Sequence, residues 1–147
     1  GVVPTLGTGG VRDERVGVTA VLYPQPFGLE AEWNWGHGPT LSRDGTRITS
    51  ESLQGGYVQA SWRIETPDAV WFPFVRWHRY DGGRKFGRNA PRTDVEELDV
   101  GCEFSPWSAV ELTVMYTHTF ARTDTTTAPY DAVRGEDRLG LQVQFEF

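Results

Sequence analysis

Residues 138–147 read RLGLQVQFEF, and apolar and polar residues alternate at every position of this stretch. Side chains on a strand point to opposite faces in turn, so the stretch predicts a strand with one apolar and one polar face. It ends on an aromatic residue, Phe147, which suits an aromatic girdle at a membrane interface. A single strand of this kind also fits a soluble protein, so the rest of the chain has to repeat the pattern.

The same alternation recurs along most of the chain. We expect strands at residues 15–23, 29–35, 56–64, 70–80, 95–104, 110–122 and 138–147. Three connections are short and rich in proline or glycine, and three are long and polar, at residues 36–55, 81–94 and 123–137. Short and long connections alternate, which predicts an antiparallel up-and-down sheet whose two ends differ. Outer-membrane barrels show this asymmetry, with short periplasmic turns and longer extracellular loops.

The two faces of these strands differ in charge. The polar face carries ionisable residues in nearly every strand, so it must be wet. It is either the outside of a soluble barrel or the wall of a water-filled lumen. In the second case the candidate lumen-facing residues are Arg63, Arg76, His78, Glu97, Asp99, Glu103, Glu111 and Arg138.

Aromatic residues favour the lumen interpretation. Those of the apolar parity fall near strand ends, as an interfacial girdle requires, whereas a soluble core more often centres them. The candidate membrane-interface aromatics are Trp35, Trp62, Trp77, Tyr116 and Phe147. The predicted fold is therefore an all-β, antiparallel up-and-down transmembrane β-barrel.

Composition excludes several other classes of function. The net charge of −6 argues against nucleic-acid binding, and the single cysteine excludes an internal disulfide framework. There is no run of about 18 apolar residues, so we expect no transmembrane helix. The histidines have no metal-ligand spacing and no nucleophile has an evident base. We therefore expect no enzyme, no metal and no cofactor.

One basic cluster stands out in this acidic chain. Between positions 76 and 92 six arginine and lysine residues face a single acid, Asp81. Four of the six are candidates for a cationic rim that attracts anions to a pore mouth, namely Arg84, Lys85, Arg88 and Arg92. Two other interpretations stay open. The cluster could bind the phosphates of outer-leaflet lipopolysaccharide, or it could be a charged surface loop without a ligand.

Three stretches resemble one known family. FVRWHRYDGGRKFGRNAPR (residues 74–92), LDVGCEFSPW (98–107) and VELTVMYTHTFART (110–123) are similar to the phosphate-selective porins O and P. The resemblance implies a bacterial outer-membrane barrel of sixteen strands. It also implies a homotrimer that passes anions by diffusion through a lumen lined with basic residues. About seven strands are present, so we expect residues 15–147 to be a C-terminal barrel segment. Residues 1–14 would be a loop or the tail of a missing strand, and the missing N-terminal strands would be partners.

The sequence therefore predicts an outer-membrane porin segment that lets small ions or anions, phosphate or polyphosphate among them, diffuse through its lumen. With every strand position of the polar parity included, inward carboxylates outnumber inward arginines, which predicts a lumen of mixed charge and leaves the solute open. The acids are Glu30, Glu32, Glu97, Asp99, Glu103, Glu111 and Glu146, and the arginines are Arg15, Arg63, Arg76 and Arg138. One alternative is a small complete outer-membrane barrel with a structural or adhesive role. Another is a soluble β-barrel with a ligand-binding interior, which would need small, dry-packed residues on one face.

Overall fold

The computed structural model of the chain describes residues 5–6, 10–42, 44–84, 91–107, 109–125 and 131–145. No helix in these residues is long and apolar enough to cross a membrane. They form seven main strands, β2 (Glu14–Leu22), β3 (Phe27–Leu41), β4 (Arg47–Trp62), β6 (Ala69–Gly83), β7 (Arg92–Trp107), β8 (Val110–Thr125) and β10 (Glu136–Phe145). Three short strands complete the set, β1 (Thr5–Leu6), β5 (Ile64–Thr66) and β9 (Asp131–Val133).

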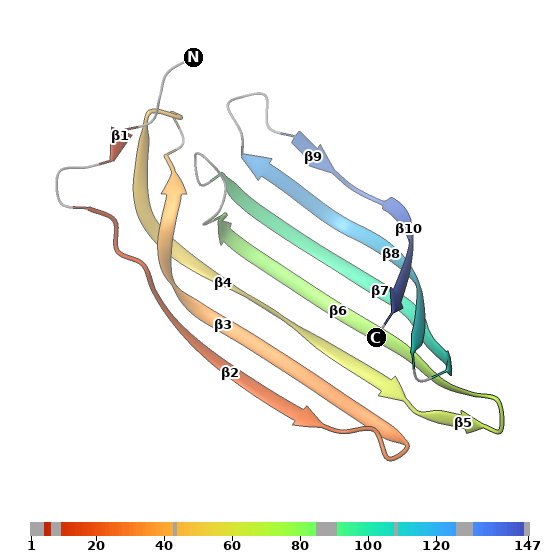
Figure 1. Cartoon of the computed structure of the whole chain (residues 1–147). Helices are drawn as coiled ribbons and strands as arrows, with labels where there is room; N and C mark the ends of the chain where they lie inside the picture. The colour runs from red at the N-terminus through yellow and green to blue at the C-terminus, as the bar shows by residue number, and fades with distance from the viewer. Residues whose placement is uncertain are drawn as a thin grey trace.

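All these strands belong to one sheet, in the order β10-β8-β7-β6-β4-β3-β2 (Figure 1). Neighbours along this path pair antiparallel. β5 pairs with β6, β9 pairs with β8, and β1 pairs in parallel with β4. The prediction of an all-β, antiparallel up-and-down sheet with seven main strands is confirmed.

The sheet is curved and open, with β2 at one edge and β10 at the other (Figure 1). Directions alternate along a path of seven strands, so the two edge strands run the same way. A direct pairing of β2 with β10 would therefore be parallel, unlike every other pairing on the path.

The predicted loop at residues 36–55 is wrong, because most of it is strand. β3 continues to Leu41 and β4 begins at Arg47. Residues Ser42, Asp44 and Thr46 close the turn between them, where the Ser42 hydroxyl donates to Asp44 Oδ1 at 2.5 Å and the Thr46 hydroxyl donates to Asp44 Oδ2 at 2.8 Å. Glycine, proline, serine and threonine interrupt the alternation in this stretch, so it carries no period-two signature although Leu41 and Leu53 are buried there.

The other two long loops are also shorter than expected. β6 reaches Gly83 and β7 begins at Arg92, while β8 reaches Thr125 and β9 begins at Asp131. The three connections at the opposite end are short, as predicted, at residues 23–26, 67–68 and 108–109. The strands of the central hairpins are therefore 15 or 16 residues long, well beyond the roughly 9–11 residues that span a bilayer.

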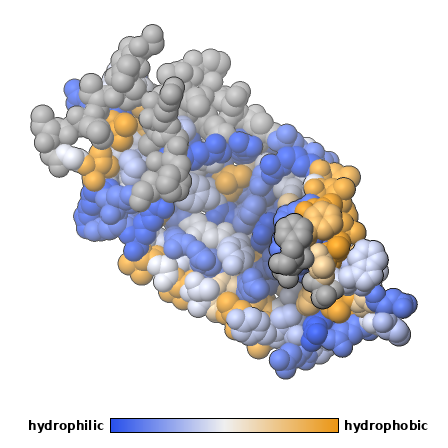
Figure 2. All heavy atoms as spheres, viewed as in Figure 1, coloured by the Kyte–Doolittle hydropathy of each residue, from blue (hydrophilic) through white to orange (hydrophobic). Residues whose placement is uncertain are grey.

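The two faces of the sheet have opposite chemistry. On β6 and β7 one face carries Trp71, Pro73, Val75 and Trp77 opposite Phe104, Cys102, Val100 and Leu98. We call this side the apolar face and the other side the polar face. Val58, Val75 and Val100 on the apolar face are 42%, 44% and 46% exposed. Figure 2 looks into the hollow of the sheet, where hydrophilic residues gather.

The buried side chains of the described residues are mostly polar, which is the opposite of the core of a soluble protein. Among the described residues only Leu41 and Leu53 are buried apolar side chains, and the buried polar ones are Thr40, Thr93, Glu97, Asp99, Thr117 and Thr119. A contiguous exposed apolar surface of this kind marks contact with lipid or with another protein.

Candidate functional site on the polar face

The register of the sheet collects most of the predicted lumen-facing residues on the polar face. Arg76 on β6 pairs with Asp99 on β7, which pairs with Thr117 on β8, which pairs with Arg138 on β10. The adjacent row runs from His78 through Glu97 to Thr119. Four strands thus bring charged and hydroxyl side chains together although they lie far apart in sequence.

Asp99 is the centre of the first group of contacts. The Arg76 guanidinium donates from Nε at 2.9 Å and from Nη2 at 2.7 Å, both to Asp99 Oδ2. The Thr117 hydroxyl donates to Asp99 Oδ1 at 2.6 Å. Both carboxylate oxygens therefore have donors, which offsets the desolvation of a residue that is 1% exposed.

Glu97 is the centre of the second group. His78 Nε2 lies 2.8 Å from Glu97 Oε2. The Thr119 hydroxyl and Arg138 Nη2 both donate to Glu97 Oε1, at 2.8 Å and 2.6 Å. Glu97 is 7% exposed, so this carboxylate too is buried and fully satisfied.

The two arginines and the histidine are much more exposed than the acids they contact. The side chains of Arg76, His78 and Arg138 are 32%, 31% and 47% exposed, against 2% for Asp99 and 10% for Glu97. We call these five residues the capped belt, because basic groups cover buried carboxylates. A hollow of about 650 Å³ opens on the polar face beside Arg76 and His78. In this belt the surface presented to solvent is basic.

The remaining two predicted acids form a different arrangement. Glu103 and Glu111 lie on the polar face close to the short connection between β7 and β8, and their side chains are hydrogen-bonded to each other. Among the described residues neither has a basic partner. Glu103 lies about 13 Å along β7 from Asp99, at roughly 3.3 Å per residue. We call these two residues the acid pair.

Arg63 does not join either group. It lies between β4 and β5, where its backbone N–H donates to the Pro26 carbonyl at 2.7 Å. Its guanidinium pairs with Glu65 at 2.5 Å and is 44% exposed. The prediction that Arg63 lines a lumen is therefore not supported by any contact with the belt.

The predicted cationic rim is only partly described. Lys85 and Arg88 lie outside the described residues. Arg84 is exposed, and its backbone N–H donates to the Pro91 carbonyl at 2.9 Å. Arg92 contacts two carboxylates, Glu51 at 3.0 Å and Asp81 at 2.8 Å. Its positive charge is therefore locally balanced, and the rim stays a prediction.

The predicted interface aromatics lie on the apolar face where the structure describes them. Trp35, Trp62 and Tyr116 are 46%, 51% and 43% exposed. Trp77 stacks on Trp33 with ring centroids 5.9 Å apart, and its indole N–H donates to Glu96 at 3.1 Å. Phe147 lies outside the described residues.

Sequence reasoning missed the role of two threonines. Alternation places Thr117 and Thr119 on the polar face but does not indicate that they are the donors beneath the belt carboxylates. Pairing of strands across the sheet decides which hydroxyl meets which carboxylate, and no local pattern carries that register. Counting inward carboxylates consequently overstates the negative charge that this part of the face presents to solvent.

No group of three or more His, Cys, Asp and Glu side chains in the described part of the chain could hold a metal ion. Comparison with known proteins gives one family. The family model described as phosphate-selective porin O and P matches residues 5–147. No curated protein and no solved structure matches the chain.

Proposed function

The chain belongs to the phosphate-selective porin O and P family, and from this premise we propose that it forms part of the wall of a bacterial outer-membrane pore. Small anions, phosphate or polyphosphate among them, diffuse passively through a water-filled lumen along the polar face. The apolar face meets lipid. The mechanism needs no covalent chemistry, no metal and no cofactor.

The capped belt is the observation that carries the anion preference. Its acids are buried and its basic groups are exposed, so a passing ion meets the guanidinium groups of Arg76 and Arg138 first. A wall lined by one sign of charge in a low-dielectric surround raises the local concentration of counter-ions. Guanidinium groups also bind phosphate oxygens through paired hydrogen bonds. The net charge of the belt is small. The anion preference therefore arises because the basic groups lie closer to the lumen than the acids do.

Membrane placement is supported by where the apolar face ends. On β6 apolar residues extend to Trp77 and Arg79 follows, while on β7 they extend to Leu98 and Glu96 precedes them. The strands continue beyond this line to Gly83 and from Arg92. Arg79 and Glu96 pair with each other across the two strands, so they mark one margin of the apolar band. From Trp71 to Trp77 the band runs about 20 Å at roughly 3.3 Å per residue, which is comparable with the roughly 25 Å apolar band of an outer-membrane barrel.

Closure of the pore requires further strands. The two edge strands run the same way, so an antiparallel barrel needs an odd number of additional strands between them. Seven strands and nine missing N-terminal strands would give sixteen, the number that the family resemblance implies. A homotrimer is part of the same proposal.

The test is single-channel conductance of the full-length gene product in planar bilayers, with the reversal potential measured in a salt gradient. We expect steady anion-favouring steps. Replacing the charged pair by Arg76→Gln with Asp99→Asn keeps the net charge and the polar contacts, and should shift the reversal potential toward cations. Arg63→Gln is the matched control and should leave it unchanged. Folded protein that never conducts would overturn the pore and favour a structural barrel.

A further inference from the structure

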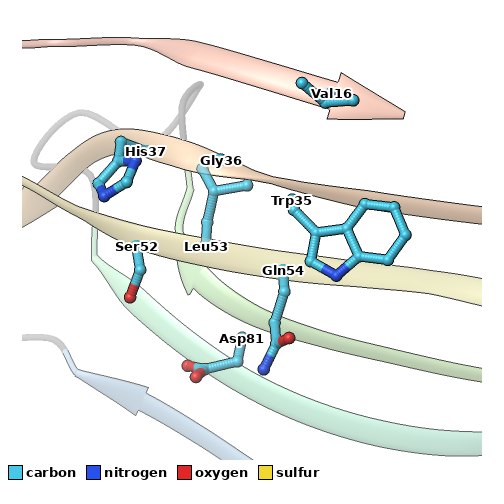
Figure 3. A pocket seen from close by; sticks show the side chains of 8 residues that line it. All are labelled: Val16, Trp35, Gly36, His37, Ser52, Leu53, Gln54 and Asp81. Atoms are coloured by element: carbon cyan, nitrogen blue, oxygen red, sulfur yellow. The ribbon is translucent and has the colours of Figure 1, made fainter. Parts of the chain in front are cut away.

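A second site lies on the opposite side of the sheet, where the apolar face ends. Trp35 on β3, Gln54 on β4 and Asp81 on β6 form one row of paired residues, with Val16 beside Trp35. Together with the neighbouring row they line a groove of about 460 Å³ (Figure 3). We call it the boundary groove, and its lining residues are Val16, Trp35, Gly36, His37, Ser52, Leu53, Gln54 and Asp81.

The lining combines one aromatic wall with several uncharged hydrogen-bonding groups. Trp35 is 46% exposed, and its indole lies at one side of the row (Figure 3). The side chains of Ser52 and Gln54 and the indole N–H of Trp35 have no protein partner within the described ranges. Trp35 and Asp81 are two strand spacings apart, about 10 Å, with Gln54 between them.

This set of groups matches a sugar better than an ion or an acyl chain. The apolar C–H face of a pyranose packs on an aromatic ring, and its hydroxyls need both donors and acceptors at short range. Serine, glutamine and histidine supply both kinds. The volume falls within the roughly 300–1,000 Å³ of small-molecule sites.

A cation lies beside the groove. Arg79 is two residues from Asp81 on β6, on the same face, and it is exposed. It has no ion-pair partner among the residues that the structure describes, since the carboxylate of Glu96 across from it accepts from Trp77. Asp81 shares the guanidinium of Arg92, 2.8 Å away, with Glu51, and Asp94 lies opposite Asp81 on β7. Arg79 is the cation in this row pair without a carboxylate partner in the described ranges, so a phosphate on the ligand would bind there.

Below the groove the apolar face continues with Val58, Val75 and Val100, all more than 40% exposed. A ligand at the groove thus has a sugar site, a phosphate site and an apolar surface in line along the strands. We propose that the boundary groove binds the phosphorylated sugar headgroup of lipopolysaccharide, with its acyl chains on the apolar face. This inference rests on the proposed function, because it takes this end of the sheet to be the extracellular one.

Native mass spectrometry of the folded full-length protein tests the inference. Short-core lipopolysaccharide is titrated in detergent against phosphatidylglycerol of equal acyl content. We expect retention of lipopolysaccharide in preference to phosphatidylglycerol. The double variant Trp35→Leu with Arg79→Gln should weaken retention about tenfold or more, since 1.4 kcal/mol is a factor of ten and a charge-assisted contact contributes at least that much.

The matched control is Trp62→Leu with Arg63→Gln, an exposed tryptophan and arginine at the other end of the sheet. It should retain lipopolysaccharide like the unchanged protein. Arg79→Lys and Trp35→Phe keep charge and stacking and should restore most of the retention, which separates loss of the site from loss of the fold. Equal weakening by both double variants, or no preference over phosphatidylglycerol, would overturn the site.

Two further measurements identify the source of the headgroup and separate this inference from the pore. Deacylated saccharide should compete poorly, because it cannot use the apolar face, and equal competition would overturn the glycolipid assignment. Conductance in bilayers without lipopolysaccharide should be unchanged by Trp35→Leu with Arg79→Gln. Protein that binds lipopolysaccharide and never conducts would keep the groove and overturn only the pore.

Discussion

The capped belt and the acid pair lie on the same face of the sheet, yet the carboxylates have basic partners in the belt and none in the acid pair among the described residues. Glu97 and Asp99 sit beneath basic side chains, whereas Glu103 and Glu111 face each other. Residue type and alternation are the same in the two places. The difference comes from the neighbouring strand, which offers Arg76 and His78 in one place and Phe72 in the other. Cross-strand register therefore decides which acids a solute can meet.

The largest difference between the two regions is expected when the basic side chain that covers a belt acid is removed. Arg76→Gln leaves the buried Asp99 charge with Thr117 as its remaining partner. We expect the free energy of unfolding in lipid vesicles to fall by about 3–5 kcal/mol, the cost of breaking a buried ion pair. Adding Asp99→Asn should recover most of the loss. Urea unfolding followed by tryptophan fluorescence measures both, and a single variant as stable as the unchanged protein would contradict the belt.

The threonines opposite Glu97 and Glu103 on β8 provide a second comparison of the two regions. Thr119→Val removes the hydroxyl that donates to Glu97 at 2.8 Å and keeps the shape of the side chain. We expect a loss of about 1–3 kcal/mol in the free energy of unfolding, because a buried carboxylate loses a donor. Thr113→Val, opposite Glu103 on the same strand, should cost no more than about 0.5 kcal/mol. Equal losses at the two positions would remove the distinction between the two regions.

Ion selectivity should depend more on the acid pair than on the belt acids, which basic side chains cover. Glu103→Gln with Glu111→Gln removes both carboxyl groups of the acid pair and with them the charge that the hydrogen-bonded pair carries, and this pair has no basic partner among the described residues. In water two charges about 8 Å apart interact by about 0.5 kcal/mol, so we expect the anion-to-cation permeability ratio to rise by about twofold. The reversal potential in a salt gradient gives this ratio. A ratio that falls, or that stays unchanged, would mean that the acid pair is not presented to permeant ions.

The smallest effect concerns a carboxylate outside both regions, in the turn between β3 and β4. Hydrogen bonds from the Ser42 hydroxyl and from Thr46 lower the pKa of Asp44 from 3.8 to about 2. A lowered folded-state pKa stabilises the turn above pH 3.8, and this contribution is lost as pH falls from 3.8 toward 2. Hydrogen exchange at the Thr46 amide should therefore show less protection, relative to the other amides, at pH 2 than at pH 5. Asp44→Asn should remove most of this pH dependence.

Sequence alone was sufficient for the strands that have one lipid-compatible face. Alternation located β8 and β10 to within a few residues, because their apolar residues recur at every second position. It failed at residues 36–55, where β3 and β4 extend beyond the apolar face and glycine, serine and threonine interrupt the alternation. Polar and glycine residues there predict a loop, although their backbones pair in register from Leu41 opposite Ile48 to Phe27 opposite Trp62.

Alternation predicts on which face of the sheet each site residue lies, but not which residue it contacts. Parity placed Arg76, His78, Glu97 and Asp99 on one face, and the structure joins them there. The burial of the acids beneath the bases could not be foreseen, since it depends on which residues stand opposite one another across three strand pairs. Alternation also predicted that Arg63 faces the lumen. Arg63 makes no contact with the belt, because it lies in the break between β4 and β5.

The order of strands along the sheet also has a kinetic consequence. Each main strand pairs with the main strand that precedes it in the chain, and only the short β1 pairs with a distant strand among those described. Each hairpin can therefore form on the edge left by the one before it, with short loops to close. The capped belt spans β6 to β10, so it is complete only when the last strand has joined. Arg138 would then act late, covering a Glu97 carboxylate that the earlier hairpins had already begun to bury.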